Sequence, residues 1–360
     1  MRALVKQSAQ PGDVTLAERP EPVAGPGQVL VRIVAAAVCG SDRSEITGKD
    51  TGLTPRVLGH EAAGVVAAIG ADVETSLQVG DRVTMETDAY LCGRCRWCRT
   101  EQYQRCPHRK GIGRTADGAL ADYLAMPVRA LHKLPDNVSL LAAALTEPTA
   151  VAVHAVIEQS PSLAGEVVVV NGPGAVGQLC AQVARAAGAT VVMAGLSRHE
   201  AKFDIARRSG IQHFVRTDVD DLAARVAEIS GGDGAHTVFE CSGAAGVLEG
   251  IGPVLSKGGR IVLVAFYKEN PVINVMELVQ NEFELVGSRG KKASSFRTAL
   301  RLMGEGLIDT LPVITKVLPL EEWERGIEYV GAGEKVVFVV DPDTVEAERQ
   351  NAGTGQLSSR

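Results

Sequence analysis

The most constraining feature of this 360-residue chain is an alternation of short apolar segments with helix-like segments between residues 150 and 287. Five apolar runs, the first at residues 167–170 and the last at residues 260–266, have the length of buried strands. Strands that alternate with helices form βαβ units, and these units pack into a parallel sheet. The pattern therefore predicts an α/β fold with a doubly wound, nucleotide-binding domain over residues 150–287.

A glycine-rich turn, GPGAVG at residues 172–177, follows the first of these strands and opens a helix. In that context glycines let the backbone approach a pyrophosphate, whose charge the free N–H groups of the helix start favour. A tight turn with packing glycines is the alternative, and the strands that follow count against it. The candidate cofactor-binding residues of the turn are Gly172, Gly174, Ala175, Val176 and Gly177.

The second strand of this domain ends without the acidic residue that NAD-binding domains place about twenty positions after the glycine turn. Gly195 stands there instead, and no Asp or Glu follows until Glu200. Gly195 leaves room for a 2′-phosphate, Ser197 can donate to it, and Arg198 can bind it as a charged fork. We therefore expect NADP to be favoured over NAD. In the alternative, Arg198 starts a helix facing water and NAD is bound through backbone contacts.

Four of the seven cysteines fall within fifteen positions, in the spacing Cys92-x2-Cys95-x2-Cys98-x7-Cys106. Four thiolates at this spacing can close a tetrahedron around Zn²⁺ without an open position, so the site would hold a loop and do no chemistry. An iron–sulfur cluster and four unbound thiols are the less favoured alternatives.

A second possible metal set is dispersed along the first 150 residues. Cys39, His60 and Glu147 offer one thiolate, one imidazole and one carboxylate, which could hold a Zn²⁺ with a position left for substrate. Taken singly, Cys39 is more often a small buried apolar residue, and His60 is more often structural.

Charge and hydropathy exclude two classes of partner. Lys and Arg number 37 and Asp and Glu 43, giving a net charge of −6 and a pI near 5.7, so no global basic field exists to hold nucleic acid. No apolar run approaches the ~20 residues of a membrane-spanning helix, and no export signal is evident. We expect a cytoplasmic protein with reduced thiols.

The motifs together resemble a known family, the zinc-dependent medium-chain dehydrogenase/reductases, over residues 1–342. The sequences CGSD, GHE, the four cysteines and GPGAVG occur in the family's order and spacing. The pair Glu147-Pro148 is most similar to the polyol (sorbitol-type) and threonine dehydrogenase branches, where a glutamate replaces a cysteine ligand. The resemblance implies a GroES-like, β-rich catalytic domain (residues 1–149 and 288–342, with a structural zinc loop at 90–107), a Rossmann domain (150–287) and a flexible tail (343–360).

The resemblance also implies roles for individual residues. Cys39 and His60 would bind a catalytic zinc, and Glu61 and Glu147 would bind it directly or through water. Ser41 would receive the alcohol proton, and Asp42 would fix the tautomer of His60. The structural zinc would be bound by Cys92, Cys95, Cys98 and Cys106. Several relatives carry a histidine where this chain has Ser44, which argues against threonine as substrate.

These features predict an oxidoreductase that transfers a hydride from a secondary alcohol, a polyol or sugar-like diol, to NAD(P), giving the ketone. Glu45, Lys49 and Arg289 are candidate polar substrate contacts. The alternatives are a dehydrogenase of simple aliphatic or aromatic alcohols, a non-catalytic NADP-binding relative, and a zinc-ribbon interaction module. We expect a homo-oligomer, a tetramer rather than a dimer, with a sheet edge near residues 260–266 and 272–275 pairing across a two-fold axis.

Overall fold

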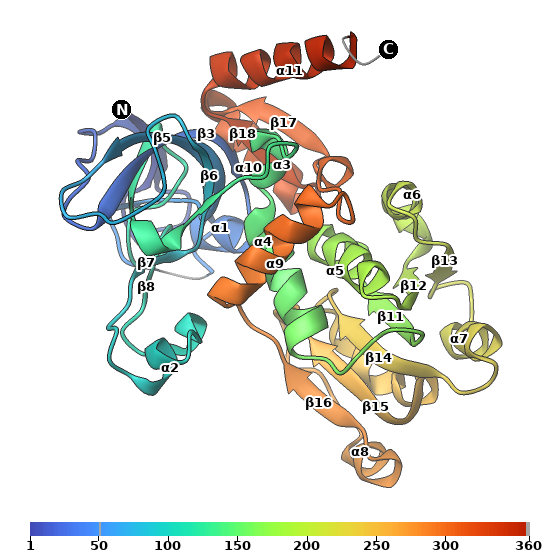
Figure 1. Ribbon diagram of the computed structural model, residues 1–360. Coiled ribbons are helices and arrows are strands. Elements are labelled where there is room, and N and C mark those ends of the chain that lie inside the picture. Colours follow the sequence, from blue (N-terminus) through green and yellow to red (C-terminus); the bar gives the residue numbers. More distant parts are fainter. Residues whose placement is uncertain (50–51, 358–360) are drawn as a thin grey trace. The chain divides into compact units, whose positions relative to one another are not determined.

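The computed structural model describes residues 1–49 and 52–357, which divide into two compact units (Figure 1). Unit 1 comprises Met1–Glu147, Lys292–Gly304 and the residues from Ile314 onward. Unit 2 comprises Pro148–Lys291 and Glu305–Val313. The helix α4 (Thr146–Val153) contains the first boundary between them.

Unit 2 is built on a six-stranded parallel sheet, as the alternating pattern predicts. The strand order is β13-β12-β11-β14-β15-β16, which is doubly wound about β11. The strands are β11 (Val167–Asn171), β12 (Thr190–Gly195), β13 (His213–Arg216), β14 (Ala235–Glu240), β15 (Leu255–Leu263) and β16 (Glu284–Gly287). The helices and short turns are η3 (His154–Glu158), α5 (Ala175–Ala186), η4 (Ser197–His199), α6 (Glu200–Arg208), α7 (Leu222–Ser230), η5 (Ala245–Gly250), η6 (Gly252–Val254), α8 (Val275–Asn281) and η7 (Leu311–Val313).

The turn between β11 and α5 requires glycine at two positions. Gly172 has φ +99°, and a Cβ there would lie 2.7 Å from the backbone nitrogen of Ser242. A Cβ on Gly177 would lie 1.9 Å from the carbonyl oxygen of Gly172. Only a residue without a side chain allows the helix to start this close to the sheet.

Two details of unit 2 differ from the sequence prediction. The helix-like segment before the last apolar run forms the short turns η5 and η6 and no α-helix, because glycines and Pro253 interrupt helical hydrogen bonding. β15 is not an edge strand, because it pairs with β14 on one side and β16 on the other. The edge is therefore β16, whose first two residues are exposed.

Unit 1 is β-rich. Its main sheet has the order β10-β6-β5-β3-β18-β17, with β9 also paired to β3, and β2-β1-β4 and β7-β8 form smaller sheets. The strands are β1 (Arg2–Lys6), β2 (Val14–Glu18), β3 (Gln28–Ala37), β4 (Arg56–Val57), β5 (Glu61–Ile69), β6 (Arg82–Met85), β7 (Asp88–Tyr90), β8 (Lys110–Gly111), β9 (Tyr123–Pro127), β10 (Leu131–Lys133), β17 (Lys316–Pro319) and β18 (Val336–Val339). Its helices and turns are α1 (Gly40–Ile46), α2 (Arg96–Arg99), η1 (Tyr103–Arg105), η2 (Val128–Ala130), α3 (Leu140–Ala143), α9 (Ala293–Gly304), η8 (Leu320–Glu322), α10 (Trp323–Gly331) and α11 (Pro342–Leu357).

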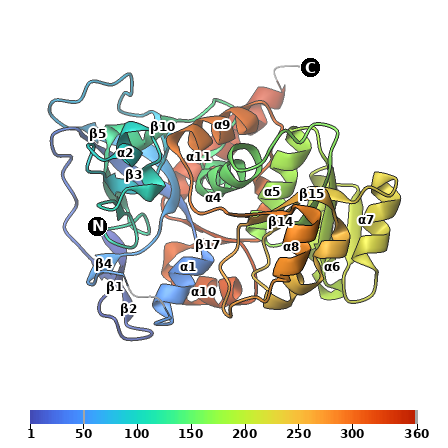
Figure 2. The ribbon, with the colours of Figure 1, turned by 90° about the horizontal axis from the view of Figure 1, so that it is seen from below.

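The register of β3 fixes which segments meet at its carboxyl end. Ala37 pairs with Glu61 at the start of β5 and with Val337 near the start of β18, both antiparallel. The strands are held by a fully buried core that includes Ile33 and Phe338. Figure 2 shows that α1, which follows β3, lies beside α10. The two helices pack so closely that a Cβ on Gly331 of α10 would touch the guanidinium of Arg43 of α1.

The C-terminal segment forms the helix α11, where the sequence analysis expects a flexible tail from residue 343. Asp341 caps its start, accepting hydrogen bonds from the backbone nitrogen of Thr344 at 3.2 Å and its hydroxyl at 2.7 Å. Val345 is buried, and Glu348 pairs with Arg82 at 3.0 Å. Tertiary contacts therefore hold the first turns of a segment whose polar composition predicts disorder. Residues 358–360 of the expected tail lie outside the described residues.

Within the described part of the chain, every helix is too short or too polar to cross a lipid bilayer.

We predict that Glu348→Ala lowers the free energy of unfolding by about 1–2 kcal/mol, because Glu348 also accepts a 2.9 Å hydrogen bond from the backbone nitrogen of Leu140. Glu346→Ala is the matched control, since Glu346 is exposed and lies 4.0 Å from Arg349 on the same helix. Urea unfolding followed by circular dichroism measures both. Equal effects of the two substitutions would contradict an anchoring role for Glu348.

Candidate functional site

Cys39 lies where β3 gives way to α1. It is the N-cap residue of α1, with extended backbone angles (φ −87°, ψ 154°). Its backbone nitrogen donates to Oδ2 of Asp42 at 2.9 Å, in the first turn of the helix. This local cap fixes the direction of the thiol at the end of a buried strand.

His60 directly precedes β5 and is oriented by the same carboxylate. Its Nδ1 lies 3.2 Å from Oδ1 of Asp42, whose side chain is 3% exposed. A carboxylate at Nδ1 favours the tautomer with the proton on that nitrogen, which leaves Nε2 as a lone-pair donor. One aspartate thus organises two of the predicted ligands.

The structure brings Cys39, His60 and Glu61 together. One ligand atom from each lies within 4.8 Å of the other two. A thiolate sulfur, an imidazole nitrogen and a carboxylate oxygen are a donor set that suits Zn²⁺, and three protein ligands leave room for a fourth. The residues therefore fit a catalytic type of zinc site.

Lys335 is part of this cluster, and the sequence analysis missed it. Its Nζ donates to the carboxylate of Glu61 and to the carbonyl oxygen of Val38, the latter at 3.1 Å. Lys335 is 7% exposed and Glu61 2%, so this is a buried ion pair. No local motif marks Lys335, because it reaches the site only through the pairing of β18 with β3.

The charges of the cluster act on one another. Burial lowers the pKa of the His60 imidazole, but the charge and hydrogen bond of Asp42 outweigh it and raise that pKa well above its ordinary value. Burial raises the pKa of Asp42, and His60 reverses the shift so that the net change is downward. Burial also raises the pKa of the Cys39 thiol, yet its hydrogen bond with His60 makes the net shift downward. All three shifts favour the charged form of the group, and each charge lies beside one of opposite sign.

Three other predicted residues lie near these elements without joining the group of three. Glu147, in the first turn of α4, is buried, but its carboxylate is not within 4.8 Å of all three ligand atoms. Ser41 is the second residue of α1 and half-buried. Glu45, a candidate substrate contact, is buried in an ion pair with Arg56.

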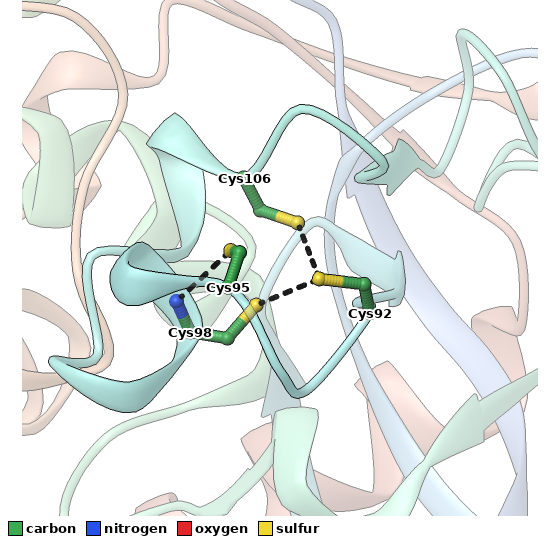
Figure 3. Close-up of side chains that lie close together, drawn as sticks. All are labelled: Cys92, Cys95, Cys98 and Cys106. Carbon is green, nitrogen blue, oxygen red and sulfur yellow. Dashed lines mark hydrogen bonds between the residues drawn. The ribbon is translucent and has the colours of Figure 1, made fainter.

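The four-cysteine loop brings its sulfur atoms together (Figure 3). Sγ of Cys92 lies 3.8 Å from that of Cys98 and 3.7 Å from that of Cys106, and Sγ of Cys95 accepts a 3.4 Å bond from the nitrogen of Cys98. All four are free thiols with sulfurs within 4.8 Å of one another. This geometry fits a closed, structural zinc site.

Two thiols of this loop differ in acidity. Backbone N–H groups of Cys95 and Arg94 lower the pKa of Cys92 to about 6. Burial raises the pKa of Cys98 to about 12. The guanidinium of Arg96 lies 3.9 Å from the centre of the Trp97 ring and adds a cation–π contact to the loop.

The glycine turn of unit 2 presents a helix N-terminus without a side-chain cap. Gly174 is the N-cap residue of α5, and no side chain accepts from the first-turn N–H groups there. Gly172, Gly177 and the intervening Ala175 and Val176 form the turn and the start of the helix. Such an end suits a pyrophosphate.

The turn after β12 carries the three residues expected to recognise the adenosine ribose. Gly195 is buried, whereas Ser197 and Arg198 are exposed in η4. Ser197 donates to Asp218 from its backbone nitrogen at 2.8 Å and from its hydroxyl at 2.5 Å. No motif of the glycine turn or of β12 marks Asp218, because it follows the next strand, β13.

A buried carboxylate orders the loop after β14. Glu240 is fully buried and accepts hydrogen bonds from the Tyr267 hydroxyl at 2.7 Å and from the backbone nitrogens of Ser242 at 2.8 Å and Gly243 at 3.2 Å. Burial and Glu240 raise the pKa of Tyr267. This loop adjoins the glycine turn, since the backbone nitrogen of Cys241 donates to the carbonyl oxygen of Asn171 at 2.8 Å.

Comparison with known proteins places the chain in a family. Residues 25–136 match the alcohol dehydrogenase GroES-like domain, and residues 175–305 match the zinc-binding dehydrogenase domain. The chain therefore belongs to the zinc-dependent medium-chain dehydrogenase/reductases and is an oxidoreductase, which confirms the resemblance and the predicted GroES-like and Rossmann architecture.

Similar proteins span nearly the whole chain. It is 36% identical over 343 residues to a sorbitol dehydrogenase of Halalkalibacterium halodurans, covering 95% of this chain and 99% of that one. It is 33% identical to a D-arabitol-phosphate dehydrogenase of Enterococcus avium, covering 96% and 99%. A zinc-binding dehydrogenase from Sinorhizobium meliloti 1021, solved with NADP, superposes with a TM-score of 0.86 at 27% identity, covering 94% of this chain and 98% of that one.

We predict that Asp42→Asn weakens Zn²⁺ binding at the Cys39–His60–Glu61 cluster by about 10- to 100-fold, because Asp42 orients both Cys39 and His60. Competition with a chromophoric chelator measures the affinity. The control is Asp72→Asn, at an exposed residue with φ 56° that asparagine also tolerates. An Asp42→Asn protein that is folded and retains its affinity would contradict the assignment.

Proposed function

We propose that this protein oxidises a secondary alcohol, a polyol or sugar-like vicinal diol, to the corresponding ketone, with a nicotinamide as hydride acceptor. The observation that carries the proposal is the Cys39–His60–Glu61 cluster organised by Asp42. It is supported by the sorbitol and D-arabitol-phosphate dehydrogenases that match almost the full length of the chain.

We assign the cluster to a catalytic zinc and the four-cysteine loop to a structural one, giving two ions per chain. Zinc supplies Lewis acidity, which favours loss of the proton from an alcohol in reach of the site. The chain's own residues hold that site in shape: Asp42 fixes the ring of His60, and Lys335 offsets the charge of Glu61. Glu147, at the start of α4, would bind the catalytic zinc through a water molecule.

Ser41 is the proposed acceptor of the substrate's hydroxyl proton. It lies two residues after Cys39 in the first turn of α1, so the helix that orients the thiol also carries the hydroxyl. A nicotinamide held at the glycine turn of unit 2 would supply the acceptor for the hydride of the same carbon. Gly172, Gly174, Ala175, Val176 and Gly177 cradle its pyrophosphate.

A polyol fits the composition better than an aromatic alcohol does. Aromatic residues make up 4% of the chain, so few are available to line an apolar pocket. Glu45 is held in an ion pair with Arg56 and is therefore withdrawn as a substrate contact. The proposed polar contacts are Lys49 and Arg289. The absence of a histidine at Ser44 supports a substrate other than threonine.

For the cofactor we propose a preference for NADP over NAD. Gly195 replaces the acid that would repel a 2′-phosphate, and the exposed Arg198 supplies a fork of donors beside it. Because both donors of Ser197 bind Asp218, Arg198 carries most of the proposed discrimination.

We also propose a homo-oligomer, with a tetramer favoured over a dimer. The edge strand β16, the helix α8 and the segment just before α8 carry exposed apolar side chains, which a second copy could cover across a two-fold axis. These side chains are Val272, Val275, Met276, Val279 and Leu285.

The substrate assignment predicts that short polyols are oxidised with kcat/KM at least about 100-fold above that of ethanol or benzyl alcohol, because a site that hydrogen-bonds substrate hydroxyls discriminates against substrates that lack them. The assay follows reduced nicotinamide by absorbance across a panel of both kinds. If ethanol or benzyl alcohol outruns every polyol, the substrate class is wrong. If no alcohol is oxidised, the enzymatic assignment itself fails.

The two metal sites predict opposite consequences of cysteine substitution. Cys39→Ser removes one zinc and abolishes turnover but leaves the fold and cofactor binding intact, whereas Cys95→Ser removes the other zinc and lowers the thermal midpoint. Metal analysis and thermal unfolding separate the two, with Cys180→Ser as a control at a buried thiol outside both clusters. One zinc or none in freshly purified, active protein is incompatible with this assignment.

The cofactor assignment predicts that Arg198→Ala weakens NADP binding by about 10- to 100-fold while sparing NAD, because one charge-assisted interaction is lost. Fluorescence titration with each reduced cofactor measures the two dissociation constants. Arg208→Ala, at the far end of α6, serves as the control for charge removal. Equal losses for both cofactors would rule the assignment out.

A further inference from the structure

We propose that Asp218 is a specificity-determining residue, which competes with the 2′-phosphate of NADP for the donors of Ser197. The inference deepens the proposed cofactor preference and rests on it only for the location of the adenosine ribose near Gly195. It concerns a residue that comes from the loop after β13, outside every motif of the cofactor site.

The geometry of Asp218 is that of an internal anion bound to the η4 turn. One carboxylate oxygen accepts from the backbone nitrogen of Ser197 at 2.8 Å, and the other accepts from its hydroxyl at 2.5 Å. The preceding residue, Thr217, donates from its backbone nitrogen to the carbonyl of Gly195 at 2.8 Å. The loop after β13 is therefore tied to the turn after β12 at two successive residues.

A carboxylate and a phosphate bind the same kinds of hydrogen-bond donor. Both are anionic acceptors of short N–H and O–H hydrogen bonds, and both are attracted to an arginine. Ser197 has two donors, and Asp218 occupies both of them. The Ser197 bonds, and after them the charge of Arg198, also lower the pKa of Asp218, so the carboxylate is ionised at neutral pH.

Asp218 can leave this position without disturbing the core. Its side chain is exposed, and its two neighbours Thr217 and Val219 are exposed as well. A cofactor that carries a 2′-phosphate has to displace the carboxylate or bind against its charge, whereas NAD requires neither. Asp218 thus replaces, from the next strand, the acid that the end of β12 lacks at Gly195, and it limits how far Arg198 can favour NADP.

A second acid in the same loop provides a matched comparison. Asp220 accepts from the backbone nitrogen of Arg216 at 3.0 Å and from its Nε at 3.2 Å, whereas both donors of Ser197 bind Asp218. Asp220→Asn therefore removes the same charge a few residues away while leaving the Ser197 donors occupied.

The test is calorimetric binding of 2′,5′-ADP and 5′-AMP to the full-length protein, its Asp218→Asn and Asp218→Ala variants, and Asp220→Asn. We expect Asp218→Asn, which keeps an acceptor but loses the charge, to bind 2′,5′-ADP about tenfold more tightly, and Asp218→Ala to bind it at least as tightly. Binding of 5′-AMP should change by less than about twofold, and Asp220→Asn should change either ligand by less than about threefold.

The outcomes separate this inference from the cofactor assignment. If folded Asp218 variants bind 2′,5′-ADP no more tightly than the parent protein, or if Asp220→Asn produces the same gain, the role of Asp218 is refuted. If the parent protein binds 5′-AMP more tightly than 2′,5′-ADP while the Asp218 variants still gain affinity, the NADP preference fails and the competition stands. Circular dichroism of each variant confirms that the fold is retained.

Discussion

The site in unit 1 depends on the register of three strands. Ala37 at the end of β3 pairs with Glu61 of β5 on one side and with Val337 of β18 on the other. Because of this pairing, the residues just beyond each strand end, Cys39, His60 and Lys335, come from distant parts of the sequence to one place. A shift of one residue in either ladder would turn every side chain of that strand to the opposite face of the sheet and take the ligands apart.

Within that frame, three buried carboxylates each face a basic partner. Asp42 faces His60, and Glu61 faces Lys335, while Glu45 of α1 forms a further buried pair with Arg56. Buried ion pairs add little net stability, because the loss of hydration offsets their attraction. Their value here is orientation: removing one partner would leave an uncompensated charge, so each carboxylate holds its neighbour in a defined position.

Features that are local in the sequence were predictable from it. The glycine turn and the four-cysteine loop each lie within fifteen residues, and their spacing alone defines the geometry that the structure has. The alternation of apolar and helix-like segments also predicted the parallel sheet that the structure contains. By contrast, Lys335 is 274 positions from Glu61 and joins it only through strand pairing.

The contacts of Asp218 and Glu348 could not be predicted from the sequence. The end of β12 carries Gly195 in place of an acid, whereas Asp218 reaches the same turn from the loop after β13. The polar composition of α11 predicted a loose tail, whereas Glu348 finds Arg82 and the nitrogen of Leu140 in unit 1. In both cases a contact between distant segments decides the outcome, and no periodicity or motif encodes it.

We propose that Cys39 and His60, held by Asp42, form a metal site separate from the four-cysteine loop. Diffraction from crystals of the purified protein at the zinc absorption edge tests it most directly. We expect two anomalous peaks per chain, one enclosed by the sulfurs of Cys92, Cys95, Cys98 and Cys106 and one bounded by Cys39 and His60. A single peak at the cysteine loop, with Cys39 and His60 arranged as here but without metal in zinc-replete crystals, would contradict it.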